Sequence, residues 1–244
     1  MAALLQTRPL NPGTLRSEPL LAVGAQASAV QEYASQITVG KPGRCSEVPS
    51  LYLGLYDNSG SVTGGNDPIG QRYLESQVAI QRVGTRCRCM KCLVATLHFD
   101  TPTSGDLRPT RIGEGNAAEI DRSLAVPPDG AGISRLLPSL VAARQLAKQH
   151  PKHETILVVY SDFELFDDYL AELVAFPGDV HAVVLRAAPP SGLIAAPNVS
   201  VTEVDYSSPP GSVARALFAA LAAHRIGADP LRSAGAIDEQ ICGE

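Results

Sequence analysis

The chain contains 244 residues, which is long for one average domain and short for two. Its 20 basic side chains against 25 acidic ones give a formal net charge of −5, and this mild acidity argues against nucleic-acid binding, which favours strongly basic surfaces. Hydrophobic residues make up 45% of the sequence, enough for a buried core, but no window approaches the roughly 20 apolar residues that a membrane-spanning helix requires, so we expect neither nucleic acid nor a membrane among the partners.

The cysteines and the first residues both bear on the cellular compartment. The five cysteines are an odd number, and three of them crowd together at Cys87, Cys89 and Cys92, which is a poor framework for disulfides. The first residues lack the basic segment and the longer apolar segment of a secretory signal. Together these features favour a reducing, cytoplasmic location.

Proline and glycine mark the limits of the predicted domain. Residues 1–46 contain Pro9, Pro12 and Pro19, so we expect an N-terminal extension that is partly disordered or forms one helix between Gly24 and Gly40. Residues 47–226 show a regular alternation of apolar runs and are predicted to form the folded domain. Residues 227–244 are expected to form a loose C-terminal tail.

Short apolar runs alternate with helical patterns through residues 47–226. The predicted strands span residues 51–56, 92–99, 107–112, 155–160, 180–185 and 199–204. The predicted helices span residues 68–83, 117–124, 134–149, 165–176 and 212–226. Continuous apolar strands are typical of sheets covered on both faces, and Pro109 confines its strand to an edge. The pattern predicts a doubly wound α/β fold with a mainly parallel sheet of about six strands, one of them an antiparallel edge strand.

The most informative motif follows the first predicted strand of this domain. Asp57, Ser59 and Ser61 are spaced at alternate positions, so in an extended loop one carboxylate and two hydroxyls would converge on a common point. Gly60 permits a tight bend between them. These oxygen ligands suit Mg²⁺ or Mn²⁺ rather than Zn²⁺. A capped turn is the alternative interpretation, because Asp and Ser after a strand often cap the next helix.

The Asp-x-Ser-x-Ser motif after an apolar strand resembles the metal-ion-dependent adhesion site (MIDAS) of the von Willebrand factor A (VWA) family, over about residues 48–226. In that family a threonine at the start of a later helix and an aspartate at the end of a later strand complete the site. Ser134 stands in the threonine's place and Asp162 in the aspartate's place. The resemblance therefore implies a Rossmann-like fold and a metal site formed by Asp57, Ser59, Ser61, Ser134 and Asp162.

The resemblance also implies a role for each ligand. Ser59 and Ser61 would bind the metal through their hydroxyls, and Ser134 would do so directly or through water. Asp57 and Asp162 would hold the metal's waters or bind the metal itself in some states. The sixth coordination position would be left for an acidic side chain of a partner protein. The implied ion is Mg²⁺, with Mn²⁺ or Ca²⁺ as alternatives, and the implied protein is an intracellular binding module that serves as an adaptor or as a subunit of a multi-protein assembly.

The sequence departs from the family pattern at three positions near these ligands. Ser134 replaces threonine and lacks the methyl group that restricts the rotamer. Ile133 and Phe163 stand where glycine is common in the family. The hydroxyl and carboxylate chemistry is retained, but these substitutions would alter the geometry of the loops.

Two rival functions follow from the same residues. An aspartate after the first strand is also the nucleophile of phosphotransferases of the haloacid dehalogenase type, but that family uses a second aspartate as acid/base where this chain has Ser59. Because that proton donor is missing, we expect no enzymatic activity. A metal-independent scaffold that binds partners through its helices or through residues 1–46 is the other alternative.

Other clusters of charged and metal-binding residues have simpler interpretations. Cys87, Cys89 and Cys92 invite a zinc assignment, but zinc needs a fourth ligand from among Cys45, His98 and Cys242, and a reduced, partly buried cysteine group is the simpler prediction. A basic cluster is predicted to form a solvated face: Arg82, Arg86, Arg88 and Lys91. An acidic cluster is predicted to favour the first turn of the helix at 165–176 through the helix dipole: Glu164, Asp167 and Asp168.

Overall fold

The computed structural model of the protein describes residues 32–63, 70–99, 101–130 and 132–231. The chain divides into two units, Met1–Gln36 and Ile37–Glu244. Residues 32–36 of the first unit are helical. Of the helix predicted between Gly24 and Gly40, residues 37–39 are not helical, and the part before residue 32 lies outside the described residues. The predicted helix start at Pro68 and the fifth cysteine, Cys242, also lie outside them.

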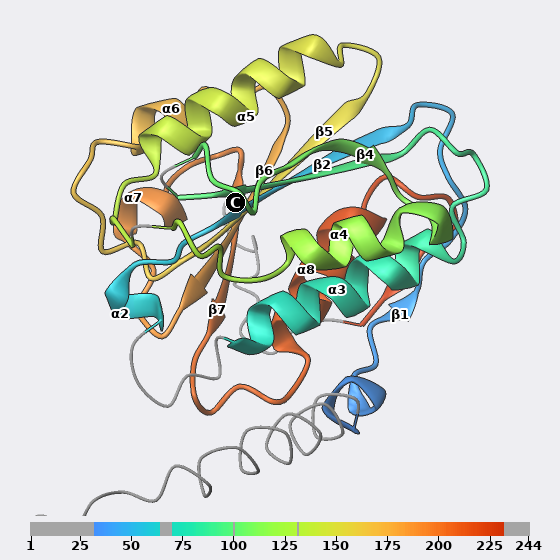
Figure 1. Ribbon diagram of the computed structural model, residues 1–244, viewed down its shortest axis with the longest axis horizontal. Helices are drawn as coiled ribbons and strands as arrows, with labels where there is room; N and C mark the ends of the chain where they lie inside the picture. Colours follow the sequence, from blue (N-terminus) through green and yellow to red (C-terminus); the bar gives the residue numbers. More distant parts are fainter. Residues whose placement is uncertain (1–31, 64–69, 100, 131, 232–244) are drawn as a thin grey trace, which may run out of the picture. The chain divides into compact units, whose positions relative to one another are not determined.

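A six-stranded sheet forms the centre of the second unit (Figure 1). In spatial order its strands are β4 (Leu107–Arg111), β3 (Leu93–His98), β2 (Ser50–Tyr56), β5 (Glu154–Ser161), β6 (Asp179–Leu185) and β7 (Val199–Val204). All neighbours are parallel except β3 and β4, which are antiparallel. The predicted doubly wound sheet with one antiparallel edge strand is confirmed, and every predicted strand agrees with the structure to within one residue at either end.

The central strands β2 and β5 are mainly apolar because both faces of the sheet are buried there. Along β2, Leu53 and Leu55 enter one core while Tyr52 and Tyr56 enter the other. The first core lies beneath α5 (Leu137–Gln149), α6 (Leu170–Val174) and α7 (Ser191–Ile194), and the second lies beneath α3 (Gly70–Gly84), α4 (Ala117–Ser123) and α8 (Ser212–Ala222) (Figure 1). In this three-layer arrangement the central strands are therefore expected to be nearly continuous apolar runs.

Two helices on the first face begin later than their sequence pattern predicts. Helix α5 starts at Leu137 rather than at Ser134, and α6 is confined to residues 170–174 of the predicted 165–176. The carboxylate of Asp167 accepts hydrogen bonds from the backbone N–H groups of Leu136 (3.2 Å) and Leu137 (2.7 Å). Asp167 therefore caps α5, and the prediction that it serves the first turn of its own following helix is wrong.

The second unit also contains a small two-stranded sheet that is separate from the six-stranded sheet. β1 (Gly40–Lys41) pairs in antiparallel fashion with β8 (Asp229–Pro230), and an isolated bridge joins Arg44 to Ile226. Gly40 has a φ of +108°, and a Cβ there would lie 2.4 Å from the carbonyl oxygen of Asp229. Residues that we assigned to the N-terminal extension and to the C-terminal tail thus pair with each other inside the second unit.

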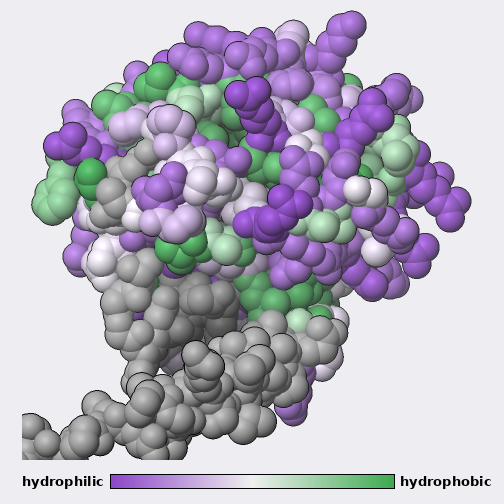
Figure 2. All heavy atoms as spheres, in the orientation of Figure 1, coloured by the Kyte–Doolittle hydropathy of each residue, from purple (hydrophilic) through white to green (hydrophobic). Residues whose placement is uncertain are grey.

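The described residues present a largely hydrophilic surface on the face drawn in Figure 2, with smaller hydrophobic patches between the hydrophilic side chains. None of the helices within the described ranges combines the length and the apolar character needed to cross a bilayer.

Candidate functional site

The predicted site residues lie at the carboxyl ends of two neighbouring parallel strands. Asp57 follows β2, Asp162 follows β5, and the backbone N–H of Asp57 donates a hydrogen bond to the carbonyl oxygen of Tyr160 (3.0 Å). From β2 the chain crosses to β3 on one side, whereas from β5 it crosses to β6 on the other. The loops therefore diverge at a topological switch point, where open α/β sheets bind their ligands.

The carboxylate of Asp57 is buried and held at both oxygens. Its Oδ1 accepts a hydrogen bond from the backbone N–H of Ser59 (2.8 Å), and its Oδ2 accepts one from the hydroxyl of Ser161 (2.6 Å). Burial raises the pKa of Asp57, the hydrogen bonds from Ser161 and Ser59 oppose this, and the negative charge of Asp162 raises it further. Two carboxylates thus interact where little water reaches them. A cation between them would offset both the desolvation of the negative charge and the repulsion between the two carboxylates.

The two serines of the motif converge as predicted, although the segment is not extended. The chain enters the short helix α2 (Gly60–Thr63) directly after Ser59, and the Oγ atoms of Ser59 and Ser61 lie 3.1 Å apart. Ser59 is 1% exposed, whereas Ser61 is exposed. The pair of hydroxyls therefore joins a buried residue to an exposed one at the edge of the protein.

The loop that contains Ser134 passes beside this motif. Gly132 has a φ of +70°, and a Cβ there would lie 3.2 Å from the carbonyl oxygen of Asn58. Ser134 itself is half-buried, and its carbonyl oxygen accepts a hydrogen bond from the N–H of Phe166 (3.0 Å) in the loop after β5. The three predicted loops thus meet at one edge of the sheet, with Ser134 in a loop before α5 rather than on its first turn.

The loop after β5 has the backbone shape of a glycine-containing loop without the glycine. Phe163 adopts a φ of +58°, the left-handed region that bulky residues rarely enter. Its side chain is buried against Tyr169, with ring centroids 5.9 Å apart, and this packing compensates for the backbone cost. Next to it, the carboxylate of Asp162 accepts a hydrogen bond from the N–H of Glu164 (3.0 Å). The departure from the family pattern at Phe163 therefore leaves a glycine-type conformation in place.

Three polar side chains that support the site, those of Arg72, Tyr73 and Ser161, were not predicted from the sequence. Arg72 on α3 is 1% exposed, and its guanidinium donates hydrogen bonds of 2.7 Å to the main-chain oxygen of Asp57 and to Oδ1 of Asn58. The hydroxyl of Tyr73 donates to the same Asn58 oxygen (2.7 Å). A helical pattern assigns Tyr73 to the apolar face and says nothing of its neighbour, so only the packing of α3 shows this role. Ser161 follows the strand predicted over residues 155–160, and its hydrogen bond to Asp57 was likewise not predicted.

An aromatic stack underlies the motif on the side of α3. The rings of Tyr56 and Tyr160 are stacked with centroids 4.6 Å apart, and Tyr73 stacks on Tyr56 at 4.8 Å. Burial raises the pKa of Tyr56 to about 12, so the ring stays neutral. The aromatic stack and Arg72 together support the loop after β2 on the side that faces α3. This support favours a preorganised arrangement of the loop's oxygen atoms.

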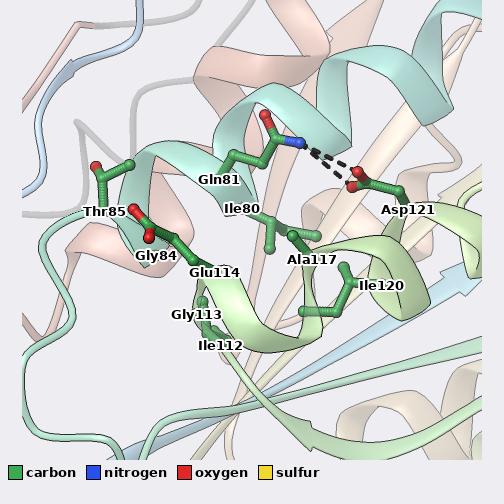
Figure 3. A pocket seen from close by; sticks show the side chains of 10 residues that line it. All are labelled: Ile80, Gln81, Gly84, Thr85, Ile112, Gly113, Glu114, Ala117, Ile120 and Asp121. Carbon is green, nitrogen blue, oxygen red and sulfur yellow. Dashed lines mark hydrogen bonds between the residues drawn. The ribbon is translucent and has the colours of Figure 1, made fainter.

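The predicted ligands fit a hard cation in their chemistry. They comprise two carboxylates and three hydroxyls on loops that meet, and oxygen ligands of this kind suit Mg²⁺. A separate hollow of about 210 Å³ lies between α3 and the segment from β4 to α4 (Figure 3). Its walls are mainly apolar, including Ile80, Ile112 and Ile120, and Gln81 donates hydrogen bonds to Asp121 at its rim. It offers no cluster of oxygen ligands comparable to the first site.

Comparison with known proteins supports the fold. No protein-family model and no curated protein sequence matches the chain. Among solved structures, proximal thread matrix protein 1 from the mussel byssus is similar, with a TM-score of 0.50 and 14% identity over 73% of this chain and 47% of that chain. The chain thus spans about half the length of the mussel protein.

Two further solved structures are more distantly similar. The open conformation of the pilus adhesin SpaC from Lactobacillus rhamnosus GG has a TM-score of 0.49 and 13% identity over 73% of this chain and 30% of that chain. The human COPII-coat protein Sec24c has a TM-score of 0.40 and 9% identity over 72% of this chain and 31% of that chain. At such low identities a likeness bears on the fold alone, and of the three only the mussel structure is close enough to support it.

Proposed function

We propose that the protein is a VWA-type binding module that docks an acidic side chain of a partner protein through a divalent cation. The ligands would be Asp57, Ser59, Ser61, Ser134 and Asp162. The observation that carries the proposal is the meeting of three loops, distant in sequence and bearing oxygen ligands, at the switch point between β2 and β5. The fold alone would not single out this function.

The ligand set suits the recognition of an external carboxylate. Neutral hydroxyls from Ser59 and Ser61 would contact the ion directly and leave most of its positive charge uncompensated. Asp57, whose two oxygens are already engaged by Ser59 and Ser161, would act mainly through the metal's waters. A carboxylate from a partner would then complete the octahedral shell of Mg²⁺. We propose an adaptor or a subunit of a larger assembly, without catalysis.

The first test is metal binding by the full chain. We expect Mg²⁺ to raise the melting temperature, because a ligand at a hundred times its Kd stabilises by about 2.7 kcal/mol, which is roughly 5–10 °C for a chain of this size. The Ser59→Ala/Ser61→Ala double variant should lose this shift. The matched control is Ser207→Ala/Ser208→Ala, which removes two hydroxyls that hydrogen-bond to another aspartate, Asp205. Unchanged shifts in the first variant would contradict the proposal.

The second test separates the rival functions. Partner capture that persists in EDTA and in the Ser59→Ala/Ser61→Ala variant would favour a metal-independent scaffold. Mg²⁺-dependent hydrolysis of a generic phosphate ester that is abolished by Asp57→Asn would favour a phosphohydrolase. The proposal requires the opposite result in both assays: capture that depends on the metal, and no turnover.

A further inference from the structure

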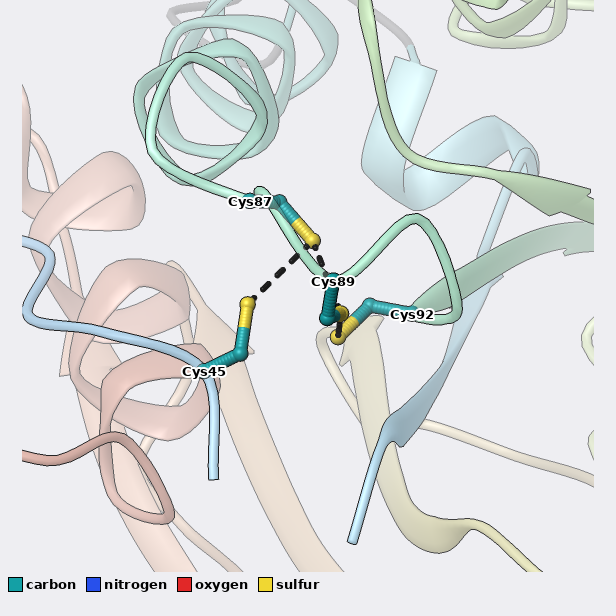
Figure 4. Close-up of side chains that lie close together, drawn as sticks. All are labelled: Cys45, Cys87, Cys89 and Cys92. Atoms are coloured by element: carbon teal, nitrogen blue, oxygen red, sulfur yellow. Dashed lines mark hydrogen bonds between the residues drawn. The ribbon is translucent and has the colours of Figure 1, made fainter. Parts of the chain in front are cut away.

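Four cysteines converge at the amino-terminal edge of the sheet (Figure 4). Their sulfur atoms all lie within 4.8 Å of one another, and three pairs, Cys45–Cys87, Cys87–Cys89 and Cys89–Cys92, are separated by 3.5, 3.6 and 3.5 Å. A tetrahedral zinc ion with Zn–S bonds of about 2.3 Å places its sulfurs about 3.8 Å apart. All four are free thiols. We infer that Cys45, Cys87, Cys89 and Cys92 bind a structural zinc ion.

The fourth ligand is the one that sequence spacing leaves undecided. Cys45 lies 42 positions before Cys87, on the segment between β1 and β2, and the pairing of β1 with β8 sets the course of that segment. His98, an alternative, lies at the far end of β3 from Cys92 and is bound to Asp106 through Nδ1 (3.2 Å). The arrangement therefore joins one distant cysteine to three local ones.

The turn that contains Cys89 and Cys92 is shaped for a shared ligand. The backbone N–H of Lys91 donates a hydrogen bond to the sulfur of Cys89 (3.4 Å), which would stabilise a thiolate there. Met90 adopts a φ of +56° although its side chain is 58% exposed. A bulky residue pays a conformational cost in that region, and packing of its own side chain does not offset it. A metal bound by the flanking cysteines would supply the compensation.

The surroundings carry the positive charge that a zinc tetrathiolate, with a net charge of −2, requires. The buried guanidinium of Arg225 donates to the sulfur of Cys45 (3.6 Å) and to the carbonyl oxygens of Pro42 (2.6 Å) and Gly43 (3.4 Å). A hollow that adjoins Cys45 and Cys89 is lined by five further basic residues, Lys41, Arg44, Arg82, Arg86 and Arg88. None of these five forms a salt bridge with an acidic residue in the described parts of the chain.

Four sulfur ligands leave no open coordination position, so the role of the ion would be structural. It would fasten the segment before β2 to the turn before β3. The site stands at the amino ends of these strands, whereas Asp57 and Asp162 stand at carboxyl ends. The inference is therefore independent of the proposed Mg²⁺ site, and each can fail without the other.

The test begins with the full chain, purified under reducing conditions without chelators. We expect elemental analysis to find one equivalent of zinc per chain, released when a mercurial reagent titrates the thiols. Reconstitution with Co²⁺ alone should give the intense visible bands of a tetrahedral cobalt thiolate. The Ser59→Ala/Ser61→Ala variant should retain the zinc, because it alters only the opposite edge of the sheet.

Single variants then assign the ligands. Cys45→Ser and Cys89→Ser should lose the bound zinc, whereas Cys242→Ser, which removes the remaining cysteine, should retain it. Where a ligand variant fails to fold, the cobalt spectrum and the thiol titration of the unmodified chain decide the matter. The inference is overturned if the reduced chain binds neither zinc nor cobalt tetrahedrally, if it purifies with iron, or if peptide mapping of fresh protein finds Cys45–Cys87 or Cys89–Cys92 disulfides.

Discussion

Asp106, in the turn between β3 and β4, should contribute strongly to stability at neutral pH. Its carboxylate accepts hydrogen bonds from the backbone N–H groups of His98 and Thr103 (3.0 Å each), from the Thr103 hydroxyl (3.0 Å) and from the Thr101 hydroxyl. Burial works against ionisation, but these hydrogen bonds and one with the His98 ring outweigh it and lower the pKa of Asp106 from 3.8 to about 2. At about 1.4 kcal/mol for each tenfold change in proton affinity, Asp106→Asn should cost about 2 kcal/mol.

The cost should depend on pH in a defined direction. Because the pKa of Asp106 is lower in the folded state, its contribution is complete above the unfolded pKa of about 4 and is lost as the pH falls through about 2. The difference in unfolding free energy between the unmodified chain and Asp106→Asn should therefore be largest at pH 7. It should shrink steadily as the pH falls below about 4.

Urea unfolding followed by circular dichroism at pH 7, 5 and 3 measures this difference directly. The exposed residue Asp168 provides a control, since Asp168→Asn removes the same charge from a solvated position and should change stability little. A loss below about 0.5 kcal/mol at pH 7 for Asp106→Asn, or a loss that does not vary with pH, would refute the reasoning.

Three further predictions concern a helix cap, a glycine and a histidine. The carboxylate of Glu75 accepts two hydrogen bonds (3.0 and 2.9 Å) from the backbone at the start of α8, so Glu75→Gln should lower the free energy of unfolding by about 1–2 kcal/mol in urea titrations. Gly132→Ala should cost about 1–2 kcal/mol and weaken the Mg²⁺-dependent thermal shift, because the new Cβ would press on Asn58, whereas Gly115→Ala meets open space and should not. Burial lowers the pKa of His181 to about 4, so its protonation should reduce the melting temperature as the pH falls from about 6.5 towards 4, and His181→Gln should flatten this dependence.

The strands could be predicted from the sequence because their cause is local to each strand. In a sheet covered on both faces the interior residues of β2 and β5 are almost all apolar, so the apolar run itself indicates the approximate limits of each strand. The start of α5 could not be predicted, because its cap comes from Asp167, about 30 positions later. A cap supplied by tertiary structure leaves no mark in the sequence near the helix it caps.

The same distinction applies to the two candidate metal sites. Ser59 and Ser61 are neighbours in sequence, so their closeness could be predicted although the predicted extended loop is in fact the start of α2, whereas the contribution of Arg72 depends on how α3 packs. Cys45 could be named only as one of three candidates, because its approach to the other cysteines depends on the pairing of segments nearly 190 positions apart. The ions at both sites stay predictions until they are measured.

The small sheet formed by β1 and β8 has a consequence for how the second unit can be combined with other proteins. The N–H of Leu231 donates a hydrogen bond to the carbonyl oxygen of Val39 (3.1 Å), so the first and last described segments of this unit lie side by side. A folded segment whose two ends lie next to each other can be inserted into a surface loop of another protein without separating the two sides of that loop. Residues 37–231 thus begin and end at adjacent points, which is the layout of a domain that can be inserted into another protein.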